Sequence, residues 1–105
     1  MKNKILFLLA PALLLGGLHT PASADEALAR SRTCMACHQV DRKVVGPSFK
    51  AIAAKYAGRP DMVDPLAKKI REGGGGVWGP VPMPANPRIS EADAKKLAGW
   101  ILGLK

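Results

Sequence analysis

One short stretch of the sequence combines two thiols with an imidazole. In Cys34-Met35-Ala36-Cys37-His38 the two cysteines are three residues apart, and the histidine directly follows the second cysteine. This pattern is typical of c-type haem attachment. Two thiols at this spacing can reach both vinyl groups on one side of a porphyrin, and the adjacent imidazole then lies under the iron. The sequence therefore predicts one covalent haem, attached through Cys34 and Cys37, with His38 as its proximal iron ligand.

Three other kinds of site could use the same side chains. A thioredoxin-like redox pair needs a βαβ context, which the sequence lacks. A zinc site needs about four ligands, and beyond the first 24 residues these two cysteines and this histidine are the only ones in the chain. A disulfide between Cys34 and Cys37 would suit an exported protein, but it closes too small a loop to stabilise a domain. Haem attachment is the interpretation that the motif favours.

Three methionines are candidates for the second axial position of the iron. Met35 lies between the attached cysteines and cannot reach across the porphyrin, while Met62 can be explained as a flexible core residue. Met83 lies in Pro82-Met83-Pro84, where the prolines favour an extended backbone. Because Met/His is one of the few common haem ligand pairs, we predict Met83 as the sixth ligand.

A long irregular segment surrounds this methionine. Residues 73–89 contain five glycines and four prolines among 17 residues, a composition that neither a helix nor a sheet can use well. The segment also contains Val77, Trp78 and Val81, which are costly to leave in water. Long loops in small domains are commonly functional. We therefore expect this loop to pack against a large apolar cofactor.

The N-terminal residues resemble a secretory signal. Lys2 and Lys4 precede an apolar run of about 14 residues, and small residues follow at 22–24. The run is shorter than the ~20 residues of a spanning helix, so we expect cleavage after Ala24 and export to the periplasm rather than a membrane anchor. Removing 24 of the 105 residues leaves 81, which we assign to one domain, residues 25–105. A domain of this size commonly needs a covalent or metal staple.

The predicted mature chain is basic. Loss of Lys2 and Lys4 leaves 14 of the 16 basic residues against all 8 acidic residues, a formal charge of +6. We therefore expect partners with acidic docking surfaces. Nucleic acid is not an expected partner, because the chain is predicted to be exported and no basic cluster is interleaved with stacking aromatics.

Helix signals occur at both ends of the domain and between them. Asp25 is a candidate N-cap for a first helix that runs toward Cys34. Ser48 can cap a second, short helix that ends before Gly58. Its expected core positions follow helical spacing: Phe49, Ile52, Ala53 and Tyr56.

Two further helices are predicted in the second half of the chain. Asp64 followed by Pro65 is typical of an N-cap and first helical residue, and Gly73 can end that helix. Ser90 and Asp93 form a candidate capping box for the last helix. The buried positions that we expect there are Ala94, Leu97, Ala98, Trp100 and Ile101. No segment alternates like a strand, so the predicted fold is all-α, with three or four short helices.

Taken with the attachment motif, two segments resemble the haem-facing loops of short bacterial class I cytochromes c. They are Val45-Gly46-Pro47 and residues 76–86, and the resemblance extends over nearly all of residues 25–105. It implies further roles near the haem. The Pro47 carbonyl would accept a hydrogen bond from His38 Nδ1, and Asn86 would donate toward the Met83 sulfur. Trp78 and Lys69 would lie at a haem propionate.

This resemblance implies a single-electron carrier and not an enzyme. With His38 and Met83 both on the iron, no position is open for a substrate, and the methionine raises the reduction potential. We expect a monomer that exchanges electrons with redox proteins of a respiratory chain. The alternative is an enzyme or gas sensor with a five-coordinate haem, in which Met83 would be an ordinary core residue.

Overall fold

The computed structural model of the chain describes residues 21–105, which form four α-helices, two 3-10 turns and no strand. The elements follow one another along the chain as α1 (Pro21–Ser31), η1 (Cys34–Ala36), α2 (Phe49–Lys55), η2 (Pro60–Met62), α3 (Val63–Glu72) and α4 (Glu91–Leu102). The prediction of an all-α fold is confirmed. Residues 1–20 of the predicted leader lie outside the described residues. No helix within residues 21–105 is long and apolar enough to cross a membrane.

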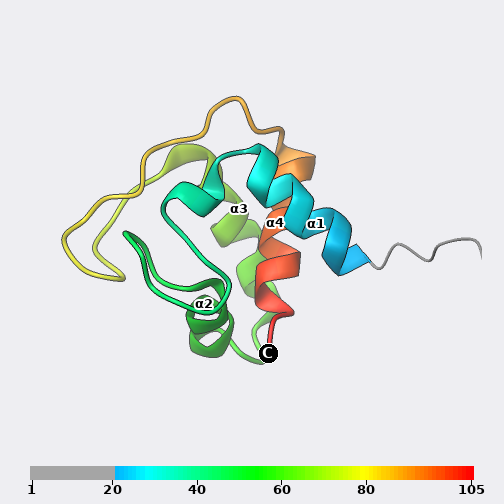
Figure 1. The fold of residues 1–105 in the computed structure, drawn as a ribbon, viewed down its shortest axis with the longest axis horizontal. Coiled ribbons are helices and arrows are strands. Elements are labelled where there is room, and N and C mark those ends of the chain that lie inside the picture. Colours follow the sequence, from blue (N-terminus) through cyan, green and yellow to red (C-terminus); the bar gives the residue numbers. More distant parts are fainter. Residues whose placement is uncertain (1–20) are drawn as a thin grey trace, which may run out of the picture.

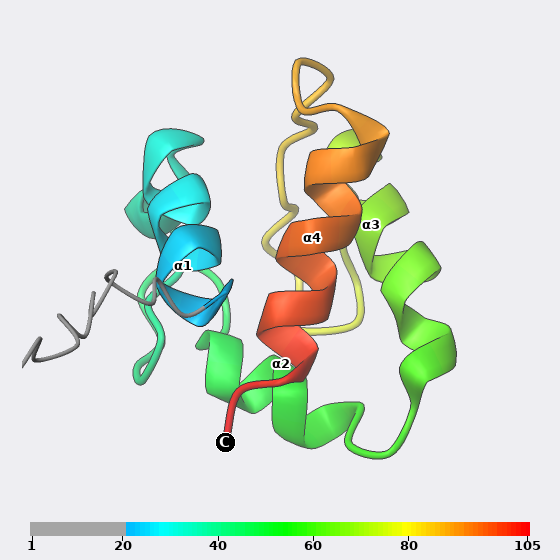
Figure 2. The same ribbon diagram turned by 90° about the vertical axis from the view of Figure 1, so that its right-hand side faces the viewer.

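Helix α4 is the central element of the fold. It lies between α1 and α3, with α2 below, as Figures 1 and 2 show from two directions. The five residues predicted as its buried face are all buried, and Leu97, Ala94 and Ala98 are almost fully inaccessible. Residues from the other helices, together with Ile89 at the end of the 73–89 loop, complete the core: Ala29, Phe49, Ile52, Ala67, Ile70 and Ile89. Burial of one apolar side chain stabilises the fold by about 1.5–3 kcal/mol. Because the core is small, loss of a single buried side chain would remove a substantial share of its stabilisation.

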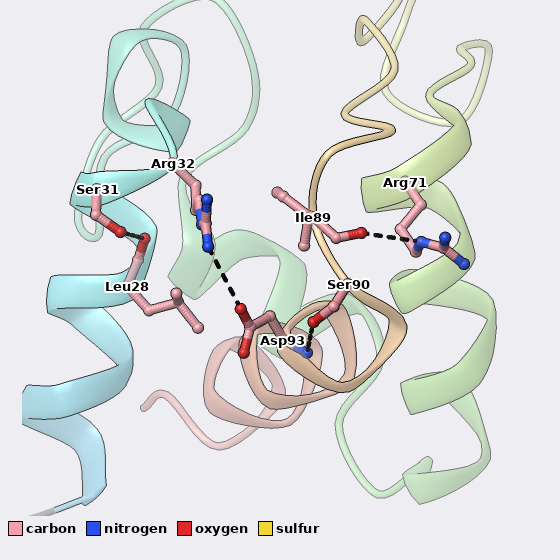
Figure 3. A network of polar contacts seen from close by, with 7 residues as sticks. All are labelled: Leu28, Ser31, Arg32, Arg71, Ile89, Ser90 and Asp93. Atoms are coloured by element: carbon pink, nitrogen blue, oxygen red, sulfur yellow. Dashed lines mark hydrogen bonds and ion pairs between the residues drawn. The ribbon is translucent and has the colours of Figure 1, made fainter.

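Two serines begin helices as predicted. Ser48 Oγ accepts a hydrogen bond from Ala51 N at 3.0 Å at the start of α2, and Ser90 Oγ accepts one from Asp93 N at 3.1 Å at the start of α4. The Asp93 carboxylate does not return to Ser90 as a capping box requires. It forms an ion pair with Arg32 at 3.6 Å and so links α4 to the end of α1 (Figure 3).

Two predicted helix starts were wrong. Asp25 lies inside α1 rather than at its cap, because the helix begins at Pro21, where a proline fits the first turn. Asp64 does not cap α3, because the turn η2 leads directly into a helix that starts at Val63. Pro65 is nevertheless tolerated, since the first-turn amides of a helix have no partners within it.

The two irregular loops lie on the same side of the helices. In Figure 1, residues 40–47 (teal to green) and the yellow part of residues 73–89 both project to the left of α3 and α4, and the orange part of the second loop returns over the top of the helices. Each loop is held by an isolated antiparallel bridge, between His38 and Lys43 and between Gly74 and Met83. These loops and the helices behind them form the walls of the candidate site.

Candidate haem site

A cavity with two lobes lies between the loops and the helices. The lobes span ≈ 800 and ≈ 940 Å³ when the open solvent at their mouths is included. Their walls are mostly apolar. Seven residues line both lobes: Cys37, His38, Ile52, Leu66, Lys69, Met83 and Pro84. The histidine and the methionine that the sequence singled out therefore face one shared space from different parts of the chain.

The attachment motif is wound into a tight turn at the wall of this cavity. The Cys34 carbonyl accepts hydrogen bonds from Cys37 N at 3.2 Å and His38 N at 2.9 Å. Thr33, just before the turn, has a φ of 61°, which turns the chain sharply after α1. Cys34 and Cys37 are not joined to each other, and Cys34 lines one lobe while Cys37 lines both. Burial raises the pKa of the Cys34 thiol, partly offset by a backbone hydrogen bond.

The imidazole of His38 is held on two sides. Its Nδ1 lies 2.8 Å from the Pro47 carbonyl oxygen, which can only accept, so the hydrogen belongs on Nδ1 and the lone pair on Nε2. The ring also stacks on Phe49, with centroids 5.1 Å apart and planes at 20°. Phe49 in turn meets the edge of Trp100 at 5.4 Å. An aromatic series thus connects the imidazole to α4.

Met83 is fixed by backbone pairing with the other arm of its loop. Gly74 N donates to the Met83 carbonyl at 3.0 Å, and Met83 N donates back to the Gly74 carbonyl at 2.8 Å. Gly73 precedes this bridge with φ 70° and ψ −162°, a conformation essentially restricted to glycine. A Cβ on Gly73 would lie 2.5 Å from the Met83 carbonyl oxygen. Close approach of the two arms therefore depends on this glycine.

Asn86 differs from its predicted arrangement. Its Nδ2 donates to the Ile70 carbonyl at 3.1 Å and the Pro84 carbonyl at 3.4 Å, rather than to the Met83 sulfur. Its backbone N donates to the Arg71 carbonyl at 3.0 Å. The last carbonyls of a helix have no partner within it, and Asn86 satisfies two of them on α3. The side chain is used as a helix cap, three residues after Met83.

Trp78 and Lys69 both line the first lobe. The Trp78 side chain is 44% exposed, and Lys55 Nζ lies over its ring at 5.4 Å from the centroid. Lys69 is half-buried and lines both lobes, and among residues 21–105 no carboxylate forms an ion pair with it. The two side chains offer an indole N–H and an ammonium group to the same space. Both are suitable donors for an anionic group bound there.

The lining fits a large, flat apolar group. Four residues on the wall of the first lobe expose much of their apolar surface to it or to solvent: Val45, Val77, Trp78 and Val81. Small domains rarely leave such a contiguous apolar surface uncovered without a function. A porphyrin would cover this surface, with an imidazole and a thioether available to its iron and two thiols beside it. The residues present therefore fit haem.

Comparison with known proteins decides the family. Residues 25–105 match the family model described as cytochrome c. This chain belongs to the cytochrome c family. As a cytochrome c it carries one covalently bound haem c and functions in electron transport, with Cys34 and Cys37 as its pair of cysteines. The predicted resemblance to small bacterial class I cytochromes is thereby confirmed.

The relatives of this cytochrome are small bacterial proteins. It is 56% identical over 96 residues to cytochrome c-552 of Nitrosomonas europaea, covering 91% of this chain and 90% of the relative. It is 50% identical over 99 residues to cytochrome c-552 of Hydrogenobacter thermophilus, covering 94% and 97%. The crystal structure of wild-type Nitrosomonas europaea cytochrome c552 superposes with a TM-score of 0.73 at 57% identity, over 76% of this chain and 99% of that one.

Three features of this cytochrome were not predicted from its sequence. Phe49 was assigned only to the core, yet it stacks on the imidazole. The position of Lys55 over the ring of Trp78 was not predicted either. Arg71, which no motif singled out, holds the end of the methionine loop through its side chain. Helical spacing placed Phe49 in the core but does not indicate which residue it stacks on, and the other two contacts join residues 18 or more positions apart.

Proposed function

We propose that this cytochrome is a periplasmic carrier of single electrons whose haem iron is held between His38 and Met83. The observation that carries the proposal is that both side chains line both lobes of one apolar cavity. The Pro47 carbonyl occupies Nδ1 of His38, which leaves Nε2 for a metal. When bound, the haem supplies an iron that gains and loses one electron.

The residues around the haem would keep the structure of the protein nearly the same in the oxidised and reduced states. The bridge to Gly74 and the cap by Asn86 fix the backbone on both sides of Met83, and Phe49 with Pro47 fixes His38. Apolar walls keep water from the cofactor, so little rearrangement accompanies each electron. With both axial positions filled no site is left for a substrate, and we therefore propose a carrier rather than an enzyme.

Trp78 and Lys69 would bind the haem propionates. Each lines the first lobe and offers a donor there, and Lys69 has no competing carboxylate among residues 21–105. A Cβ on Gly74 would lie 2.8 Å from Lys69 Nζ, so the glycine leaves room for the ammonium group. Charge-assisted hydrogen bonds of this kind are the stronger class.

The visible spectrum of protein matured in a periplasm tests this proposal. We expect a ferric methionine-to-iron absorption band and no change when carbon monoxide is added to the reduced protein. A five-coordinate enzyme or gas sensor would lack the band and bind carbon monoxide. A dithiol oxidoreductase would carry no haem absorption at all, so one experiment separates the three functions.

The position of Gly46 gives a prediction about His38. We expect Gly46→Ala to displace the imidazole from Pro47, because the new Cβ would lie 2.5 Å from Cε1 and 2.9 Å from Nδ1. Overpacking of this kind costs about 1–3 kcal/mol. Denaturant unfolding of the haem-loaded protein measures the loss. The control is Gly99→Ala, where the new Cβ meets nothing within 4 Å and we expect a gain of about 0.5–1 kcal/mol. Equal stabilities of the two variants would contradict the prediction.

Partners of this carrier would be redox proteins with acidic docking surfaces. Of the cations near the attachment segment, Lys50 is paired with Asp41 at 2.6 Å. Among residues 21–105, Arg42, Lys43 and Lys55 form no ion pair, and Lys55 lies at the rim of the cavity beside Trp78. Exposed charges of this kind act mainly on the rate of encounter. We propose that the protein works as a monomer.

We expect the second-order rate of electron transfer to an acidic redox partner to fall as salt rises. Screening reduces the Debye length from ~10 Å at 0.1 M to ~3 Å at 1 M. Stopped-flow mixing over this range measures the dependence. Lys55→Gln should weaken this salt dependence more than Lys96→Gln, a charge-matched change on α4, because Lys55 lies over the ring of Trp78, a residue that lines the first lobe. A second-order rate that does not change with salt concentration would mean that docking depends on apolar contact alone.

A further inference from the structure

Three residues form a closed ring of hydrogen bonds at the end of the methionine loop. The Arg71 carbonyl accepts from Asn86 N at 3.0 Å, and the Asn86 carbonyl accepts from Ile89 N at 3.2 Å. Arg71 Nε closes the ring by donating to the Ile89 carbonyl at 3.1 Å (Figure 3). Two of the three links are backbone pairs, and only the third uses a side chain. Arg71 is therefore the one member that a substitution can remove from the ring.

This ring joins the parts of the fold that determine where Met83 lies. Arg71 is in the last turn of α3, Asn86 follows Met83 by three residues, and Ile89 precedes the N-cap of α4. Ile89 is only 3% exposed, so its end of the ring is anchored in the core. Between Met83 and the ring there are only Pro84 and Ala85. Movement of the ring relative to α3 would be transmitted to Met83 with little chain to absorb it.

The guanidinium of Arg71 has no competing partner among residues 21–105, where no carboxylate forms an ion pair with it. Its half-buried side chain is directed instead at a backbone carbonyl 18 residues along the chain. Loss of that donor would leave the carbonyl of a buried residue with one partner fewer, a costly state. The contact is thus specific, and it does not serve a general surface charge network.

We propose that Arg71 is a positioning residue for the axial methionine. By tethering Ile89 to α3, its guanidinium holds the returning arm of the loop so that Met83 stays on the iron. This inference rests on the proposed ligation by Met83. The Gly74 bridge fixes the methionine from one side, and the Arg71 ring fixes it from the other.

Imidazole binding to the ferric, haem-loaded protein tests the role of Arg71. Imidazole reaches the iron only when Met83 leaves, so its apparent affinity reports how readily the loop opens. We expect Arg71→Met to bind imidazole about tenfold more tightly than the wild type, equivalent to roughly 1.4 kcal/mol. Arg71→Lys keeps the charge but places a methylene where Nε lies, and we expect at least about a threefold increase in affinity, equivalent to roughly 0.65 kcal/mol. That is within the net range for one ordinary hydrogen bond.

The matched control is Arg88→Met. Arg88 is exposed and makes no side-chain hydrogen bond or ion pair within the described part of the chain, so this variant loses the same charge without touching the ring. Its imidazole affinity should stay within about twofold of the wild type, which is below the effect of one such hydrogen bond. If Arg71→Met does not fold, Arg71→Lys decides by the same comparison.

Two other outcomes have different meanings. If both Arg71 variants bind imidazole like Arg88→Met, the positioning role is overturned, even where denaturant unfolding shows lower stability. If the wild type itself lacks the methionine-to-iron band and binds imidazole as tightly as Met83→Ala, the ligation by Met83 fails instead. The wild-type spectrum therefore separates failure of the proposed function from failure of this inference.

Discussion

Met83→Ala should keep the covalent haem but lose the sixth ligand. The sulfur links of Cys34 and Cys37 to the haem and the imidazole of His38 are untouched by the change, while the Met83 side chain, which lines both lobes, is truncated. We expect loss of the ferric methionine-to-iron band, binding of carbon monoxide in the reduced protein, and a lower reduction potential. Axial ligands set haem potentials over a range of ~0.8 V, and a fall of about 0.1 V or more is expected here.

Met62→Ala is the matched control for this experiment. Met62 lies at the end of η2, outside the lining of both lobes, so its loss should leave the band and the potential unchanged. Spectra and redox titrations of the two variants are measured side by side. A Met83→Ala protein that retains the band would exclude Met83 as the ligand, and loss of the band in Met62→Ala would make Met62 the candidate.

The second large effect is expected at Gly73. Alanine there would have to adopt φ 70° with ψ −162°, and its Cβ would lie 2.5 Å from the Met83 carbonyl oxygen and 2.7 Å from Ala85 N. These are backbone atoms that cannot rotate away. Strain of about 1–3 kcal/mol adds to the clash, so we expect Gly73→Ala to lower the free energy of unfolding by about 3 kcal/mol or more and to weaken the methionine-to-iron band.

Gly58→Ala separates backbone strain from the clash. Gly58 has a similar φ of 74°, but a Cβ there would meet nothing within 4 Å. The left-handed conformation costs a non-glycine residue about 1–2 kcal/mol, so we expect a loss of that size and an unchanged band. Denaturant unfolding followed by absorbance gives both quantities. The explanation would be wrong if the two variants lost equal stability and both kept the band.

Features encoded within a few residues could be predicted from the sequence. Ser48 and Ser90 cap helices through amides three residues away, and Gly73 ends α3 because it alone can turn the chain there. The attachment motif identified the cofactor for the same reason, since both thiols and the imidazole are five residues or fewer apart. The contact between His38 and Pro47 followed from the family resemblance, and its role in orienting an iron ligand stays a prediction.

Features that depend on competition between distant partners could not be predicted. The short side chain of Asp93 matched a capping box, but Arg32 from the end of α1 offers its carboxylate a charged partner. Asn86 was expected to bind a sulfur, but unpaired helix carbonyls are stronger acceptors than a thioether and α3 presents them at the same point. Local patterns contain no information on which of two partners lies nearer in space.

The Gly74–Met83 bridge also divides the loop into parts with different freedom to change in length. Residues 75–82 lie between Gly74 and Met83, whose backbones are hydrogen-bonded to each other. The bridge therefore holds the two ends of this segment together whatever its length. Doubling the number of residues in such a closed loop raises the entropic cost of loop closure by only about 0.6 kcal/mol. Pro84 and Ala85, by contrast, span the fixed interval between the bridge and the cap on α3. In evolutionary terms, closure of the chain at the bridge permits insertions and deletions between residues 75 and 82 as long as Trp78 and the apolar residues of the first lobe keep their places. A change in the length of the two-residue spacer would instead displace Met83 relative to α3.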